Sequence, residues 1–244
     1  MLEAALWGAI GASSLLLGAL IGVLFRLPSR LIGLVLGFGA GTLISAVAFE
    51  LTEEAFDLGG ADAVVTGLAA GALAYFAGDY LIANRGASDR MNPMGSTAVS
   101  TSASTALLLG AVLDGIPESA VIGLTLLDGG SVGVAVLVAV FISNLPEAMS
   151  SSSGMREAGA STWHVLQTWT WVVLASAAAA AAGYGLLENA SGNTVALIQA
   201  FAGGAVLTML TDTMIPEANR HGGRAVGLFT VLGFAVAYLL TLVE

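Results

Sequence analysis

Two residue types are missing from this chain of 244 residues, which contains neither cysteine nor lysine. Without cysteine there can be no disulfide bond, no thiolate metal ligand and no thiol nucleophile. Charged residues make up only 10% of the chain, and its seven basic residues are all arginine. The formal net charge of −10 would repel a polyanion, so we expect no nucleic-acid partner.

Apolar residues, in contrast, are abundant: they make up 57% of the chain, and its mean hydropathy is +0.89. A soluble domain of this length could not bury so much apolar surface. The composition therefore predicts an all-α, polytopic protein of the lipid bilayer, with residues 1–244 forming a single transmembrane domain. We find no nucleotide-binding loop and no soluble catalytic domain, so we expect neither an enzyme nor an ATP-driven pump, and no cofactor.

Eight apolar spans of about 20 residues account for most of the chain. They lie near 3–25, 31–55, 62–84, 104–127, 131–154, 163–187, 194–215 and 225–243. All arginines fall in the first, third, fifth and seventh loops, whereas the charged residues of the other loops and of both termini are all acidic. Basic loops stay on the cytoplasmic side, so we expect both termini outside. The third loop, residues 85–103, is rich in Ser, Thr and Gly and is expected to be a flexible cytoplasmic connector.

Two internal repeats organise these spans. At an offset of 29 residues, Pro117-Glu118 in the fourth span matches Pro146-Glu147 in the fifth. At an offset of 163, residues 38–41 of the second span (FGAG) resemble residues 201–204 of the seventh (FAGG), and the match extends to Glu-Ala at 54–55 and 217–218. The second and seventh spans run in opposite directions, which is typical of inverted-repeat transporters.

The repeats divide the chain into a 3+2+3 arrangement. Residues 1–84 form the first three-helix repeat, 104–154 the central helix pair, and 163–243 the second repeat. Small residues that serve close helix packing could alone produce the similarity between spans two and seven. Such small-residue faces also allow a homodimer without requiring one.

The central pair carries the candidate metal site. Charge inside a membrane span is costly and usually marks an ion or substrate pathway. Residues four apart share a helix face, so Asp114 and Glu118 can point into one cavity. Ser143 and Glu147 can do the same from the next span, where Asn144 lies one turn from Glu147. Each proline also frees the carbonyl four residues before it.

Such an oxygen-rich set suits divalent cations. As an alternative, the acids could be protonated or satisfied by hydrogen bonds between helices, although no arginine lies within a span to pair with them.

Other polar residues in or near the spans are weaker candidates. Glu50 and Glu53, with Glu54, lie toward the outer end of the second span, where they either collect cations or form a solvated helix end. Asp212 lies toward the inner end of the seventh span and either lines an exit path or caps a helix. We interpret His164 and His221 as solvated loop residues. Trp163, Trp169 and Trp171 suit an interfacial belt.

These motifs resemble the ZIP (Zrt/Irt-like) family of divalent-metal transporters. In that family the fourth span typically carries His-Asn-x-Pro-Glu-Gly and the fifth a similar x-Asn-x-Pro-Glu-Gly. Pro117-Glu118 matches the first motif, and Asn144, Pro146 and Glu147 match the second. The resemblance also covers the glycine-rich second and seventh spans and the Ile-Pro-Glu sequence at 215–217.

The resemblance implies movement of divalent metal toward the cytoplasm across the plasma (inner) membrane, by a divergent bacterial or archaeal member of the family. The family histidine is replaced by Asp114, the asparagine after it by Gly115, and the position before Asn144 is Ser143. The sixth span offers no further ligand, which favours a single metal site.

The replacement of imidazole by carboxylate should change which metal ions the site prefers. Zinc favours nitrogen and sulfur ligands, whereas manganese and magnesium bind well to oxygen alone. The candidate substrates are Mn²⁺, Zn²⁺ and Fe²⁺. We therefore expect either a selectivity shifted toward Mn²⁺ or a broad selectivity among these ions. Two alternatives stay open: a ZIP-like scaffold that moves protons or an organic cation, and a non-transporting metal sensor.

Overall fold

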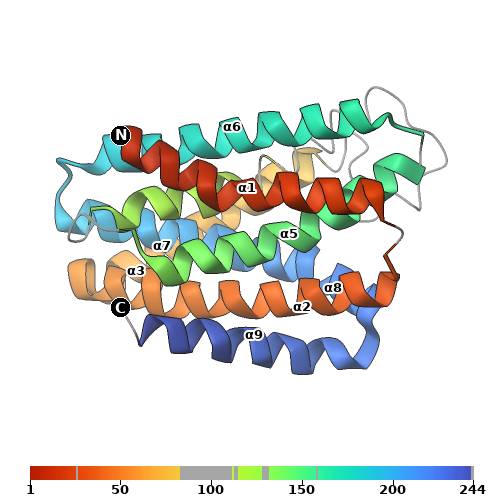
Figure 1. Ribbon diagram of the computed structural model, residues 1–244. Coiled ribbons are helices and arrows are strands. Elements are labelled where there is room, and N and C mark those ends of the chain that lie inside the picture. Colours follow the sequence, from red (N-terminus) through yellow and green to blue (C-terminus); the bar gives the residue numbers. More distant parts are fainter. Residues whose placement is uncertain (26, 83–111, 113–114, 128–131, 158, 243–244) are drawn as a thin grey trace.

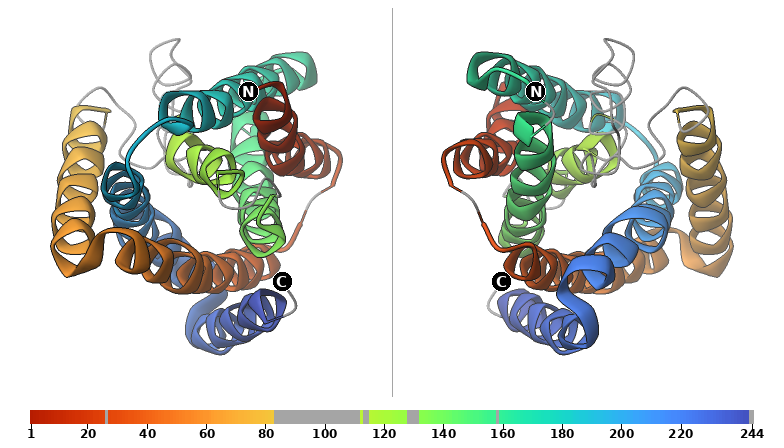
Figure 2. Two further views of the ribbon diagram at one scale, coloured as in Figure 1. Left: turned by 90° about the vertical axis from the view of Figure 1, so that its left-hand side faces the viewer. Right: turned by 90° about the vertical axis from the view of Figure 1, so that its right-hand side faces the viewer.

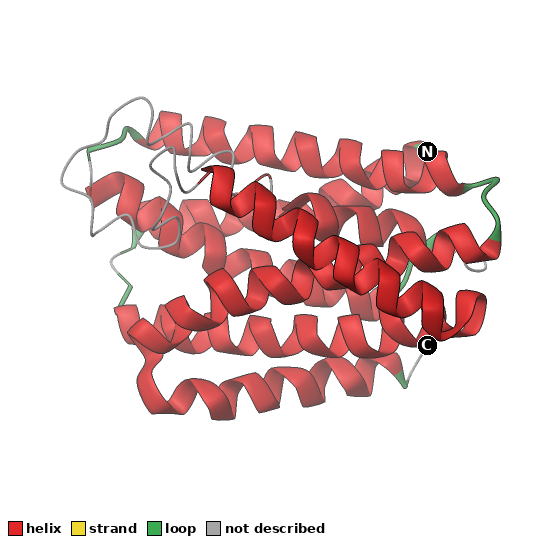
Figure 3. Ribbon diagram, turned by 180° about the vertical axis from the view of Figure 1, so that it is seen from behind, coloured by secondary structure: helices red, strands yellow, loops and turns green. Residues whose placement is uncertain are grey.

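The structure, a computed structural model, describes residues 1–244 except 26, 83–111, 113–114, 128–131, 158 and 243–244. Throughout this described part every regular element is a helix and none is a strand (Figure 3). The long helices lie side by side along one axis, and both chain ends lie at the same end of the bundle (Figure 1).

The structure shows where each of the helices begins and ends. In order they are α1 (Leu2–Leu24), α2 (Ser29–Ala46), η1 (Val47–Thr52), α3 (Glu53–Ile82), α5 (Val134–Glu157), α6 (Thr162–Leu187), α7 (Gly192–Met209), η4 (Leu210–Met214), α8 (Ile215–Gly222), η5 (Gly223–Ala225) and α9 (Val226–Thr241). Residues 115–125 are also helical.

Five helical runs among the described residues are long and apolar enough to cross a membrane. Two of them, Ser29–Leu81 and Gly192–Thr241, contain 53 and 50 residues. At about 1.5 Å per residue a straight helix of that length would be more than twice as long as the hydrocarbon core is thick. Each run instead turns back at a glycine, so the chain is an all-helical, polytopic membrane protein, as its composition predicted.

The two turning points have nearly the same backbone conformation. Gly60 has φ 71° and ψ −176°, and Gly223 has φ 64° and ψ −152°. A residue with a Cβ rarely adopts such angles, so glycine is needed at both turns. They are separated by the offset of 163 residues that the sequence repeat shows.

The π-helical segments recur at the same offset: η1 begins at Val47 and η4 at Leu210. π-Helical turns are rare and are found mostly at functional sites. Their recurrence means that the two halves share unusual backbone geometry as well as similar residues.

Glycines, which carry no side chain, let pairs of helices approach until their backbones are in contact. A Cβ on Gly41 of α2 would overlap the carbonyl oxygen of Thr230 in α9, and one on Gly204 of α7 would overlap the carbonyl oxygen of Leu68 in α3. The α2–α9 and α3–α7 pairs are therefore held by main-chain packing, the mode that small residues permit within membranes.

Helix α5 lies inside the bundle. It packs mainly against α1 and α2 and also touches α9 and α6, and the end-on views of Figure 2 show it enclosed while α3 and α9 lie at the periphery. Gly18 of α1 brings that helix against the carbonyl oxygen of Leu145 in α5. The largest cluster of buried apolar side chains joins α2, η1, α5, α7 and η4 with Val121 and Ile122.

Large apolar side chains are exposed on the outward faces of the helices. They include Leu6, Ile10 and Leu17 on α1, Val65, Leu73 and Phe76 on α3, and Leu228, Val231 and Leu239 on α9. Apolar patches of this extent are rare on soluble monomers, whereas lipid tails cover them in a membrane.

Two expectations about the second half of the chain are wrong. The helix of the seventh span does not end near residue 215 but continues through η4 and α8 to Gly222, with Pro216 directly after the π-helical segment. Trp169 is not an interfacial residue. It is buried between α5 and α6, and its Nε1 donates a hydrogen bond to Ser152 Oγ at 2.7 Å.

The glycine contacts predict a clear difference between substitutions. Gly41→Ala and Gly204→Ala should each cost about 1–3 kcal/mol of unfolding free energy, because the new methyl group meets a carbonyl oxygen. Gly227→Ala in α9 is the matched control, since nothing lies within 4 Å of its Cβ position, and it should be neutral or slightly stabilising. Thermal unfolding midpoints in detergent measure the difference. Equal midpoints for the three variants would contradict the packing described.

Candidate metal site

Two helical segments position the acids of the candidate site. Glu118 follows Pro117 within the helical residues 115–125, and Glu147 follows Pro146 inside α5. Pro146 has no N–H to donate to the carbonyl oxygen of Ile142, one turn earlier. The structure therefore keeps a carbonyl without its usual helical donor beside the α5 acid.

The candidate ligands that the structure describes are all buried. Glu118 is 2% exposed and Glu147 is 6% exposed, while Ser143 and Asn144 are 1% and 3% exposed. Asp114 lies outside the described residues. Carboxylates are seldom buried to this extent without a charged or metal partner, so the burial itself sets these positions apart from the surface acids.

The neighbours of Ser143 show where the α5 part of the site lies. A Cβ on Gly39 of α2 would be 2.9 Å from the Cα of Ser143 and 3.1 Å from the methyl carbon of Met214 in η4. The absence of a side chain at Gly39 thus lets α2 and η4 close over α5 beside the candidate ligands.

The helix that carries Glu118 is fixed by α1, α5 and α6. Gly123 packs against the main chain of Ala180 in α6, and Ile122 approaches Gly11 of α1. The N–H of Gly133, just before α5, donates a hydrogen bond of 3.0 Å to Thr125 Oγ1. Residues 115–125 and α5 are therefore joined at one end as well as packed on the same neighbours.

The described residues do not form a site made of acids and histidines alone. Within the described ranges no group of three or more His, Asp or Glu side chains could hold a metal ion. The amide of Asn144 and the hydroxyl of Ser143 would have to supplement Glu118 and Glu147. Such an oxygen donor set matches the preference of hard divalent cations.

The weaker candidates are less buried than these residues. Glu50 is half-buried in η1, Glu53 is exposed at the start of α3, and Asp212 is exposed in η4. Glu53 and Asp212 are thus open to the surroundings of the protein, whereas Glu50 is partly enclosed. Their part in a pathway stays a prediction.

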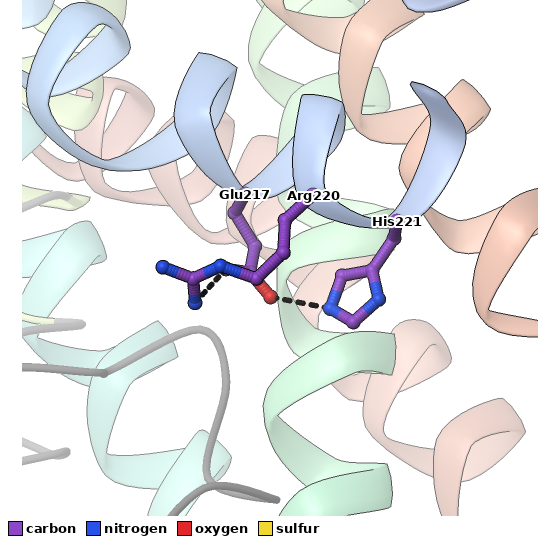
Figure 4. Close-up of polar contacts among 3 residues, drawn as sticks. All are labelled: Glu217, Arg220 and His221. Carbon is purple, nitrogen blue, oxygen red and sulfur yellow. Dashed lines mark hydrogen bonds and ion pairs between the residues drawn. The ribbon is translucent and has the colours of Figure 1, made fainter.

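Sequence reasoning missed a third buried acid, Glu217 of α8, which is 4% exposed. Its Oε2 accepts from Nη1 of Arg220 at 3.0 Å, and its Oε1 lies 2.6 Å from Nε2 of His221 (Figure 4). His221 is therefore on a helix and in contact with an acid, not a solvated loop residue. The spacing Glu-x-x-Arg-His, which places both basic groups one turn from the acid, was the available signal.

Comparison with known proteins gives one relationship. No protein-family model matches the chain. Over 210 residues it is 24% identical to an Arabidopsis thaliana protein named "Putative zinc transporter". The match covers 84% of this chain but 33% of that protein, so the chain spans about a third of the relative's length.

The Glu217 group predicts a local stability effect. Glu217→Gln should lower the unfolding free energy by about 1–3 kcal/mol, because His221 and Arg220 lose a charged acceptor that is shielded from water. Asp212→Asn changes an exposed acid nearby and should have little effect. Thermal midpoints of the two variants, compared with the native protein, measure this. A larger loss for Asp212→Asn would show that Glu217 does not hold the end of α8.

Proposed function

We propose that this protein transports divalent metal cations across a membrane toward the cytoplasm. The observation that carries the proposal is the burial of Glu118 and Glu147, each next to a proline in an apolar helical segment. The name of the Arabidopsis relative supports metal transport in general. In this role the chain is a multi-pass protein of the plasma (inner) membrane and not an enzyme.

The proposed transport site lies between residues 115–125 and α5. Glu118 and Glu147 supply charge, and Asn144 and Ser143 supply neutral oxygen atoms, with Asp114 as a further ligand. Because nitrogen ligands are absent from this set, we propose that it accepts Mn²⁺ at least as well as Zn²⁺ or Fe²⁺. Because this set contains few side-chain oxygens, we propose that the site holds one metal ion at a time.

The proposed topology is eight spans in a 3+2+3 inverted repeat with both termini outside. It is supported by the recurrence of π-helical segments and glycine turns at one offset. It is also supported by the distribution of arginine. The end of the bundle opposite the termini, where α2 begins and α5 ends (Figure 1), carries Arg30 and Arg156, as a cytoplasmic side would.

The packing suggests which parts move. Helices α1, α5 and α6 contact one another, whereas α2 packs on α8 and α9, and α3 on α7. We propose that the first group moves against the second and opens the site alternately to each side. Cations would enter past Glu50 and Glu53 and leave past Asp212. The contact of Gly39 with Ser143 belongs to the α2–α5 interface, where small residues permit sliding.

Uptake of metal into proteoliposomes tests the proposed function. Purified protein should take up Mn²⁺ and other divalent ions saturably, and Glu118→Gln or Glu147→Gln should reduce the rate at least about tenfold, because each removes a charged ligand. Glu188→Gln, which alters an exposed acid at the end of α6, should transport normally.

Three other outcomes would contradict the proposal. Flux of protons or an organic cation without metal would assign the scaffold to a different substrate. Metal binding without flux would indicate a sensor. Metal uptake that survives in both glutamine variants would place the site elsewhere.

Metal affinity should also rise with pH. Carboxylate ligands bind metal only when deprotonated, so binding releases protons and is weakened as the medium becomes acidic. The dissociation constant for Mn²⁺ should therefore fall between about pH 5 and 8. Calorimetry in two buffers with different ionisation enthalpies counts the released protons directly. An affinity that is constant over this range, with no proton release, would contradict a site made of carboxylates.

A further inference from the structure

One buried side chain has no role in the site described so far. Gln199 of α7 is 1% exposed, and its Oε1 accepts no hydrogen bond from any part of the chain that the structure describes. Burying an amide oxygen without a donor costs stability, and a leucine of similar size would avoid that cost. A polar group kept under these conditions needs an explanation.

The neighbours of Gln199 on the same helix face show what it approaches. Ala196 and Gly203, three residues before it and four after it, share its face of α7. Ala196 meets Gly59 of α3, and a Cβ on Gly203 would be 3.3 Å from Cγ1 of Val47 and 3.8 Å from Cδ1 of Leu51, both in η1. Gln199 therefore stands between two contacts with the segment 47–59.

The acid Glu50 lies in that segment, between Val47 and Leu51, and its side chain is half-buried. The face of α7 that holds Gln199 continues toward the buried core. Ala202 and Val206, three and seven residues beyond Gln199, belong to the buried cluster that also contains Ile122 and Val140. Gln199 thus lies between the segment that holds Glu50 and the core beside the helices of Glu118 and Glu147.

From this arrangement we propose that Oε1 of Gln199 is a ligand in an outer subsite, where it and the carboxylate of Glu50 receive a divalent cation before it reaches Glu118 and Glu147. The proposal rests on the transport function proposed above. A cation there would give the amide oxygen the partner that no described residue supplies. One carboxylate and one neutral oxygen bind a divalent ion weakly, and a site on a pathway must release its ion.

The test compares Gln199→Leu with the native protein in Mn²⁺ uptake and in thermal unfolding without metal. Loss of the ligand should raise KM for Mn²⁺ roughly tenfold, whereas the unfolding midpoint should stay the same or rise, because the unpartnered oxygen is gone. A residue with a purely structural role would show the reverse, a lower midpoint and an unchanged KM.

Two further variants make the result specific. Ser45→Ala removes another fully buried oxygen without a hydrogen-bond partner, so it should raise the midpoint without affecting KM. Gln199→Glu keeps an oxygen ligand and adds charge, so it should lower KM for Mn²⁺ relative to Gln199→Leu.

The outcomes separate the two proposals. If the native protein takes up Mn²⁺ and its KM is the same in Gln199→Leu, the outer subsite is wrong and the transport function stands. If neither the native protein nor any variant moves a divalent ion, both proposals are wrong. A KM raised equally by Gln199→Leu and Gln199→Glu would also overturn the subsite, because the oxygen ligand would then be irrelevant.

Discussion

A carboxylate can be kept at membrane depth only when protein encloses it, because hydrocarbon neither solvates charge nor supplies hydrogen bonds. The position of α5 follows from this constraint. It packs against α1, α2, α9 and α6, and its Glu147 is buried. Glu118 is buried on the neighbouring segment. The apolar residues of the chain can then face lipid on the outer helices, while polar oxygens collect inside.

Enclosure on this scale needs helices that approach one another very closely. Glycines at Gly41 and Gly204 bring α2 to α9 and α3 to α7 until backbone touches backbone. These two pairs repeat the same contact in the two halves of the chain. Gly18 gives α1 a similar contact with α5. The α2–α9 and α3–α7 pairs thus form one group of closely packed helices, and α1, α5 and α6 form a second. The two groups meet where Gly39 of α2 lies against Ser143 of α5.

Features that depend on neighbouring residues could be predicted from the amino-acid sequence alone. Long apolar runs exclude strands and water-facing helices, and the Pro-Glu pairs mark broken, charged segments wherever they occur. The 163-residue repeat was visible from a few glycines and one Glu-Ala pair, and the backbone shares it through the π-helical segments and through Gly60 and Gly223. Periodicity could not show that the helix of the seventh span continues to Gly222, because a proline usually ends a helix and Pro216 here lies within a continuous helical run.

Partners between distant residues depended on packing. Trp169 lies in a tryptophan-rich stretch typical of a membrane interface, and only the packing of α5 against α6 brings Ser152 beside it. Gln199 is similar, since nothing in its neighbours along the chain says that its oxygen will be buried without a donor. The sequence by itself determined the helical membrane class, the repeat and the acids of the two Pro-Glu pairs, because hydropathy and proline chemistry act locally. Only the tertiary structure decided which helices enclose the acids and which polar groups meet, because those choices depend on contacts between residues far apart in the chain.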